Sequence, residues 1–238
     1  MNKEIFRFKQ FSVDQTGCAM KINTDGVLLG AIADADDPAT ILDIGTGTGV
    51  IALMLAQRFT NAKIDAVEID TDAAHTADRN FKASLFADRL AVYPSGFESF
   101  FEQFPERKYD LIVSNPPFYI DSLKSPGAKK TLAKHADIDF FERLIKGISN
   151  HLLPDGCSWL ILPVAMSDMI IALAAKYLLY PQRFINIHSY KHSNAHRVIL
   201  HIGFNKVSPE IFRVTIYREE KVYSEEYVKL LQFYFVVF

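Results

Sequence analysis

A glycine-rich loop and a later acidic residue carry the first candidate chemistry in the sequence. The loop reads Asp43-Ile44-Gly45-Thr46-Gly47-Thr48-Gly49 and follows an apolar run that predicts a buried strand. Glycines permit a tight turn there, and backbone N–H groups at the start of the next helix are able to face a ligand. Glu68 ends a second apolar run, 23 residues after Gly45. A carboxylate at that place can accept hydrogen bonds from both hydroxyls of a ribose.

The spacing of the glycines narrows the class of ligand. A dinucleotide fingerprint needs Gly-x-Gly-x-x-Gly, but position 50 is valine and the third glycine comes one residue early. The loop also lacks the Lys-Ser/Thr pair of a phosphate-binding P-loop. A nucleoside ligand without a pyrophosphate, such as S-adenosylmethionine, fits this pattern. The alternative is that the glycines and the acid only shape turns.

A second motif, Asn115-Pro116-Pro117-Phe118, follows another predicted strand. Two prolines stiffen the backbone, and the preceding asparagine is restricted to an extended conformation. The Asn115 side-chain oxygen and the Pro116 carbonyl can therefore accept the two hydrogens of an exocyclic amine and orient its lone pair. Phe118 would stack on an extruded base, a contact worth about 1–3 kcal/mol. The alternative interpretation is an ordinary proline turn.

The elements around these motifs predict an α/β fold. Strands are expected at 40–44, 63–69, 90–93, 109–114, 159–162, 184–188 and 198–204, and helices at 49–59, 71–86, 138–153 and 166–179. This alternation predicts a mostly parallel seven-stranded sheet with helices on both faces. The last two strands flank a polar turn and predict an antiparallel C-terminal edge. Such a sheet binds its ligands outside the carboxyl ends of its strands, where both motifs lie.

Composition excludes several classes of protein. The 238 residues include 49% hydrophobic and 23% charged residues, which suits one globular domain, and the formal net charge is −2. Any contact with a polyanion therefore needs a local basic patch. Cys18 and Cys157 match no zinc or redox spacing. We expect no membrane span, no signal peptide and a cytoplasmic location.

The N-terminal part makes the pattern more specific. Phe8-Lys9-Gln10-Phe11 is followed by a run from Cys18 to Gly30 that reads CAMKINTDGVLLG. With the motifs above, the chain resembles class I S-adenosylmethionine-dependent methyltransferases that methylate amino groups. It is most similar to the bacterial tRNA (adenine-N6)-methyltransferases that modify the adenine beside the anticodon of a valine tRNA. The resemblance covers nearly the whole chain.

The resemblance implies a Rossmann-like fold, S-adenosyl-L-methionine as cofactor, and methyl transfer to N6 of adenine 37 in the tRNA anticodon loop. It implies one domain over 1–238, with 1–36 as an extension that covers cofactor and substrate. Asn115, Pro116, Pro117 and Phe118 would be catalytic. The cofactor residues would be Lys21, Thr24, Asp25, Gly26, Asp43, Gly45, Thr46, Gly47, Gly49, Glu68, Ile69 and Ser95. Related enzymes often carry an acid at the cofactor adenine, whereas this chain reads Pro94-Ser95-Gly96-Phe97.

The RNA-binding residues are expected in two places. The segment after the tetrad carries Lys124, Lys129, Lys130 and Lys134 against one acid, and it would either bind phosphates or form a solvated loop. Arg197, with Lys191 and His192, could also touch RNA. His188, His192 and His196 recur every four residues, but they lie in a predicted turn, so we expect no metal site.

Two other functions stay open. One is methylation of a protein glutamine, as in release-factor methyltransferases, which share Asn-Pro-Pro but usually have tyrosine fourth and a helical domain first. Here Phe118 stands fourth and only 42 residues precede Asp43. The other is a non-catalytic protein that binds S-adenosylmethionine or RNA.

Overall fold

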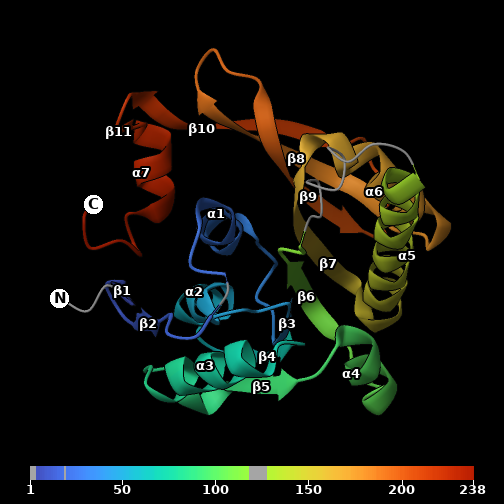
Figure 1. Ribbon diagram of the computed structural model, residues 1–238, viewed down its shortest axis with the longest axis horizontal. Helices are drawn as coiled ribbons and strands as arrows, with labels where there is room; N and C mark the ends of the chain where they lie inside the picture. The colour runs from blue at the N-terminus through green and yellow to red at the C-terminus, as the bar shows by residue number, and fades with distance from the viewer. Residues whose placement is uncertain (1–3, 19, 118–127) are drawn as a thin grey trace.

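A computed structural model describes residues 4–18, 20–117 and 128–238, and the side chains of 128–137 are not part of the description (Figure 1). Nine strands form the central sheet of the described chain, in the order β11-β10-β8-β9-β7-β6-β3-β4-β5. Their bounds are β3 (Thr40–Ile44), β4 (Lys63–Glu68), β5 (Leu90–Pro94), β6 (Tyr109–Ser114), β7 (Leu152–Pro163), β8 (Tyr180–Tyr190), β9 (Ala195–Gly203), β10 (Glu210–Glu219) and β11 (Val222–Tyr223).

The predicted α/β class and the mostly parallel sheet are confirmed. β5, β4, β3, β6 and β7 run parallel to one another, and β9 is antiparallel to both β7 and β8. The sheet extends past the seven predicted strands, because β10 pairs in parallel with β8 and β11 turns back on β10. The alternation of buried Val214 and Ile216 with more exposed neighbours is the strand signal that the prediction missed.

Helices cover both faces of the sheet, as predicted (Figure 1). One face carries α1 (Thr24–Ile32), α2 (Val50–Arg58), α3 (Thr71–Lys82) and α7 (Glu225–Leu231). The other face carries α4 (Phe97–Gln103), α5 (Ala128–His151) and α6 (Ser167–Lys176). Each face has its own hydrophobic cluster, and the sheet separates the two. None of the helices in the described part of the chain is both long and apolar enough to cross a bilayer.

The expected break at Pro154-Asp155-Gly156 lies inside a strand. α5 ends at His151, two residues before the predicted end, and β7 begins at Leu152. The pairing of β7 with β6 shifts register across this stretch, which accommodates the proline and glycine at the start of a long strand. A Cβ at Gly156 would lie 2.8 Å from the Tyr109 carbonyl oxygen, so only glycine fits there.

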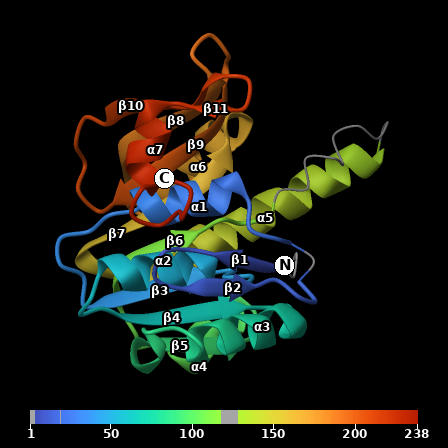
Figure 2. The ribbon, with the colours of Figure 1, turned by 90° about the vertical axis from the view of Figure 1, so that its left-hand side faces the viewer.

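A short N-terminal hairpin packs against the end of the chain. β1 (Ile5–Arg7) and β2 (Ser12–Asp14) pair antiparallel, and Phe8 forms a bridge with Phe235. The Phe8 and Phe11 rings stack at 4.4 Å, and Phe235 packs against Phe8 at 5.6 Å. The hairpin and the segment after α7 lie on the same side of the molecule, which faces the viewer in Figure 2.

This aromatic contact leads to a stability prediction. We propose that residues 1–238 form one domain and therefore unfold together. Phe8 is only 5% exposed, so its ring belongs to the buried contact. Phe8→Ala should lower the free energy of unfolding by about 3–5 kcal/mol in a single chemical-denaturation transition. Phe233→Ala is the control, because Phe233 is 68% exposed and its loss should cost under about 0.5 kcal/mol. Equal effects of the two changes, or two separate transitions, would contradict this account.

Candidate active site

The glycine loop after β3 is held by the end of β4. Gly45, Gly47 and Gly49 have φ values of 74°, 56° and 83°, in the left-handed region that glycine adopts without strain. The N–H groups of Gly45 and Thr46 both donate to the Val67 carbonyl, at 2.8 and 3.1 Å. A Cβ at Gly45 or Gly47 would have no atom within 4 Å. The loop therefore turns sharply and leaves open space where a ligand could approach its backbone.

Glu68 connects the glycine loop to the helix after β4. Its Oε2 accepts a hydrogen bond from the Gly47 N–H at 2.8 Å, and its Oε1 accepts one from the Asp70 N–H at 2.9 Å. The side chain is only 8% exposed. Each carboxylate oxygen keeps a further lone pair, because a carboxylate can accept about four hydrogen bonds. The site therefore presents an oriented carboxylate with remaining acceptor capacity.

Asp43 lies fully buried below this loop. Its Oδ2 accepts a hydrogen bond from the Thr46 hydroxyl at 2.6 Å, whereas no described residue hydrogen bonds to Oδ1. Burial raises the pKa of Asp43 to about 7, and the nearby Glu68 charge acts in the same direction. Two buried acids therefore share the base of the site.

A cavity of about 320 Å³ opens beside the loop at the carboxyl ends of β3, β4, β5 and β6. Seven of the predicted site residues line it: Gly45, Glu68, Ile69, Ser95, Asn115, Pro116 and Pro117. Ile69 is 77% exposed, an unusual position for an isoleucine that leaves an apolar surface at the cavity rim. Asp43, Thr46, Gly47 and Gly49 belong to the loop beside it and are not among its lining residues.

The Asn-Pro-Pro segment reaches the same cavity from β6. The Ser114 hydroxyl donates to the Ile44 carbonyl at 2.8 Å, which ties the end of β6 to the end of β3. Asn115 is then half-buried, Pro116 buried and Pro117 exposed. Among the described residues, none hydrogen bonds with the Asn115 side chain. Phe118, the fourth residue of the motif, lies outside the described residues.

Glu98, Phe140 and Arg143 are among the cavity residues that the sequence reasoning missed. Glu98 on α4 and Arg143 on α5 form an ion pair at 3.0 Å, and Phe140 packs edge-on against Phe97 at 5.7 Å. The free Glu98 oxygen, Oε2, lies 3.5 Å from the place of a Cβ on Gly96. The sequence did hold a signal for Glu98, because this residue comes three positions after Ser95, close to a strand end. It held none for Arg143, since only the packing of α4 on α5 brings that side chain to the cavity.

The predicted residues of the N-terminal segment lie outside the cavity lining. Lys21 pairs with Glu4 at 3.0 Å, and Asp25 pairs with Arg197 at 2.7 Å. Thr24 and Gly26 lie in the first turn of α1, and they do not line the cavity either. Their neighbour Met20 does line it and is 59% exposed.

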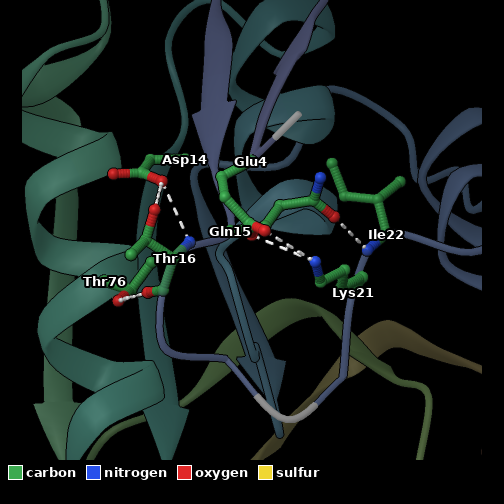
Figure 3. A network of polar contacts seen from close by, with 7 residues as sticks. All are labelled: Glu4, Asp14, Gln15, Thr16, Lys21, Ile22 and Thr76. Carbon is green, nitrogen blue, oxygen red and sulfur yellow. Dashed lines mark hydrogen bonds and ion pairs between the residues drawn. The ribbon is translucent and has the colours of Figure 1, made fainter. Parts of the chain in front are cut away.

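A polar network holds this segment in place (Figure 3). The Gln15 side-chain oxygen accepts a hydrogen bond from the Ile22 N–H at 2.7 Å. The Asp14 carboxylate accepts hydrogen bonds from the Thr16 N–H and hydroxyl at 2.9 and 2.6 Å. Thr76 on α3 donates to the Thr16 carbonyl at 3.3 Å. The segment before α1 is thereby connected both to the hairpin and to the helix that follows Glu68.

The expected RNA-binding residues are only partly described. Lys124 lies outside the described residues, and Lys129, Lys130 and Lys134 lie on α5 where only the backbone is described. The Arg197 guanidinium is engaged with Asp25. The His188 Nδ1 lies 2.7 Å from the Ser193 carbonyl oxygen. Within the described ranges, no group of three or more His, Cys, Asp or Glu residues could hold a metal.

Comparisons with known proteins agree with this geometry. The model of the methyltransferase small domain family matches residues 21–167. A tRNA1(Val) (adenine(37)-N6)-methyltransferase of Pedobacter heparinus is 47% identical over 99% of this chain and 100% of its own length. A protein of the same name from Flavobacterium psychrophilum is 41% identical over 98% and 99%. The crystal structure of a predicted O-methyltransferase from Agrobacterium tumefaciens shares the fold, with a TM-score of 0.69, 18% identity and coverage of 88% and 96%.

The raised pKa of Asp43 predicts a pH dependence of stability. In the unfolded chain this carboxyl ionises near 3.8, but in the folded protein only near 7. At this carboxyl the folded state therefore binds more protons in between, so the contribution of Asp43 to the free energy of unfolding falls as pH rises through this window. Asp43→Asn removes that loss. The free energy of unfolding of the variant, relative to the wild-type protein, should therefore be about 3–4 kcal/mol higher at pH 7.5 than at pH 4.

The exposed Asp88 provides the control for this measurement. Asp88→Asn should leave the pH dependence of the wild-type protein unchanged. A constant stability difference between the Asp43→Asn variant and the wild-type protein, from pH 4 to pH 7.5, would show that Asp43 ionises normally.

Proposed function

The chain belongs to the methyltransferase small domain family and, within it, to the tRNA1(Val) (adenine(37)-N6)-methyltransferases, and from this premise we propose that it methylates N6 of an anticodon-loop adenine, adenine 37 of a valine tRNA. It is an S-adenosylmethionine-dependent enzyme. One observation carries the proposal most directly: the Asn115–Pro117 segment lines the same cavity as Gly45 and Glu68. An amine-binding motif and a nucleoside-binding motif thus share one space.

The residues present suit S-adenosylmethionine. When bound, this cofactor supplies an electrophilic methyl group on a sulfonium and a neutral leaving group. Glu68 would accept hydrogen bonds from the ribose hydroxyls, and the open backbone at Gly45 and Gly47 would face the methionine portion. The orphaned Asp43 oxygen leaves unused hydrogen-bonding capacity beneath the same loop. Met20 would cover the site from the N-terminal segment.

The rim of the cavity offers groups for the adenine of the cofactor. Ile69 presents an apolar face, and Ser95 and Glu98 line the wall beyond it. The Oε2 atom of Glu98 lies over Gly96, while its Oε1 is held by Arg143. Glu98 would therefore supply the acid that the sequence lacks at the usual place, with Ile69 against the ring.

Asn115 and Pro116 would position the target amine. The Asn115 side-chain oxygen and the Pro116 carbonyl would each accept one hydrogen of N6, which increases electron density on nitrogen and turns its lone pair toward the cofactor side of the cavity. The amine would lose a proton to water after transfer, so the site needs no strong general base. Phe118 would stack on the target base.

An anticodon-loop adenine suits this arrangement as the acceptor of the methyl group. An anticodon-loop adenine is largely single-stranded, so its extrusion costs less than opening a duplex. Lys124, Lys129, Lys130 and Lys134 would contact phosphates beside the site. Because tRNA is the substrate, the protein would act in the cytoplasm.

A transfer assay tests the proposal. The protein is incubated with labelled S-adenosylmethionine and unmodified total tRNA, and the RNA is digested to nucleosides. We expect labelled N6-methyladenosine. Label in a release-factor glutamine instead would favour the protein-methylating alternative. Cofactor binding without transfer to either substrate would favour a non-catalytic protein.

A substitution of Asn115 tests the assigned chemistry. Asn115→Ala removes one of the two acceptors for N6, so kcat should fall by about 10²–10³-fold. The Kd for S-adenosylhomocysteine, measured by calorimetry, should change less than threefold. If kcat fell and the Kd for S-adenosylhomocysteine rose by a similar factor, Asn115 would be a cofactor-binding residue, contrary to the role assigned here.

Glu68→Ala should weaken cofactor binding and leave the rate at saturating cofactor largely unchanged. Losing a carboxylate that hydrogen bonds to the ribose should raise the Kd for S-adenosylhomocysteine by at least about tenfold, since such bonds contribute about 1.5–3 kcal/mol. At saturating cofactor the rate should recover most of its wild-type value. Unchanged cofactor affinity would rule out the ribose contact, and an unfolding curve serves to confirm that the glycine loop still folds.

A further inference from the structure

The active-site edge of the sheet continues well beyond the cavity. β8 and β10 are parallel to each other, and both run in the direction of β7 because β9 is antiparallel to β7 and β8. Their carboxyl ends therefore lie at the same edge as the end of β6. Tyr217 pairs with Tyr190 there, and Ser114 pairs with Leu160. The β8–β9 turn and the end of β10 thus share an edge with the Asn-Pro-Pro segment.

This distant part of the edge carries a basic groove. A cavity of about 470 Å³ is lined by Lys191, Arg213 and Arg218, with Tyr217 and a single acid, Glu225. We use the name basic groove for the three cations. Their concentration contrasts with the net charge of −2 for the whole chain. Among the lining residues three cations outnumber one acid, while Glu219 and Glu226 lie next to the groove. A local excess of positive charge along the lining is what a polyanion requires of such a protein.

The groove is built on ordered contacts. Arg213 Nη2 donates to the carbonyl oxygens of Tyr190 and Lys191, which ties β10 to the end of β8. The Tyr217 ring stacks on Tyr223 at 5.2 Å, and Tyr223 stacks on Tyr227 of α7 at 4.9 Å. The backbone around the groove is therefore held by the β8–β9 turn, by β10 and β11 of the sheet, and by α7.

Two of its cations are available to a ligand. Lys191 is exposed. Among the described residues, the ion pair of Arg218 is with its sequence neighbour Glu219, at 3.4 Å, and both side chains are more than 60% exposed. An exposed pair of this kind contributes little and exchanges easily for a phosphate. The adjacent Glu226 is already engaged, because it accepts a hydrogen bond from the Thr215 N–H at 3.0 Å.

We propose that the basic groove binds backbone phosphates of the tRNA strand that flanks the target adenine. Four strand spacings separate β10 from β6, or about 19 Å, a separation that a few nucleotides of a single strand bridge. This inference rests on the proposed function for the identity of the RNA. The groove anchors the strand at one point while Asn115 holds the extruded base at another. Its contribution is to affinity and register, and not to the methyl-transfer step.

The test removes the two exposed cations together. For Lys191→Ala/Arg218→Ala, the Kd for unmodified total tRNA should rise about tenfold in filter binding near 0.1 M salt. The slope of log K against log salt should become shallower by about 1.4, because each lost phosphate contact with a single strand is worth about 0.7. The kcat at saturating tRNA and the Kd for S-adenosylhomocysteine should stay at wild-type values.

A matched control removes the same charge from the opposite edge of the sheet. Lys63 begins β4 and Lys206 follows β9, and both are exposed. Lys63→Ala/Lys206→Ala should leave the Kd for tRNA within about twofold of the wild-type value and the salt slope unchanged. Equal losses in the two double variants, or no loss in the first, would overturn the groove as an RNA site.

These outcomes separate this inference from the proposed function. If the wild-type protein forms N6-methyladenosine but the groove variant binds tRNA normally, only the groove assignment fails. If the wild-type protein binds tRNA through the groove but transfers no methyl group to it, only the proposed activity fails. A wild-type protein that does not bind tRNA at all overturns both.

Discussion

The two hydrogen bonds of the Glu68 carboxylate are the contacts on which the rest of the site depends. One oxygen holds the Gly47 N–H and the other holds the Asp70 N–H, so a single side chain fixes both the glycine loop and the start of α3. The same negative charge adds to burial in raising the pKa of Asp43. Burying these two acids lowers the stability of the folded protein but keeps a shaped, polar loop, as is common where a protein binds a ligand.

Sheet topology brings the second half of the chemistry to this loop. β6 pairs with β3, and the Ser114 hydroxyl bonds the Ile44 carbonyl, so the Asn-Pro-Pro backbone leaves the sheet directly beside the glycine turn. Rigid prolines would then hold the proposed acceptors for the amine in a fixed geometry. From the N-terminal segment Met20 lines the cavity, and the Arg197–Asp25 pair and the network around Gln15 hold that segment in place.

Sequence reasoning succeeded where local pattern and topology agree. Buried parallel strands read as continuous apolar runs, and the residues after them must meet at one edge, so Gly45, Glu68 and Asn115 could be placed together from the chain alone. It could not foresee contacts that tertiary packing decides. Arg143 reaches the cavity only because α5 packs on α4, and the ion pair of Arg197 with Asp25 joins residues more than 170 positions apart. Whether the N-terminal residues Lys21 to Gly26 touch the cofactor remains a prediction from family resemblance.

We expect one cavity to hold the cofactor and the target amine together, and a structure with both ligands is the decisive measurement. We would determine the crystal structure of the protein with S-adenosylhomocysteine and an unmodified anticodon stem-loop. We expect an extruded adenine with N6 within hydrogen-bonding distance of the Asn115 side-chain oxygen and the Pro116 carbonyl, and a cofactor ribose hydrogen bonded to Glu68. An adenine that stays stacked in the loop, or that binds with N6 directed away from Asn115, would contradict it.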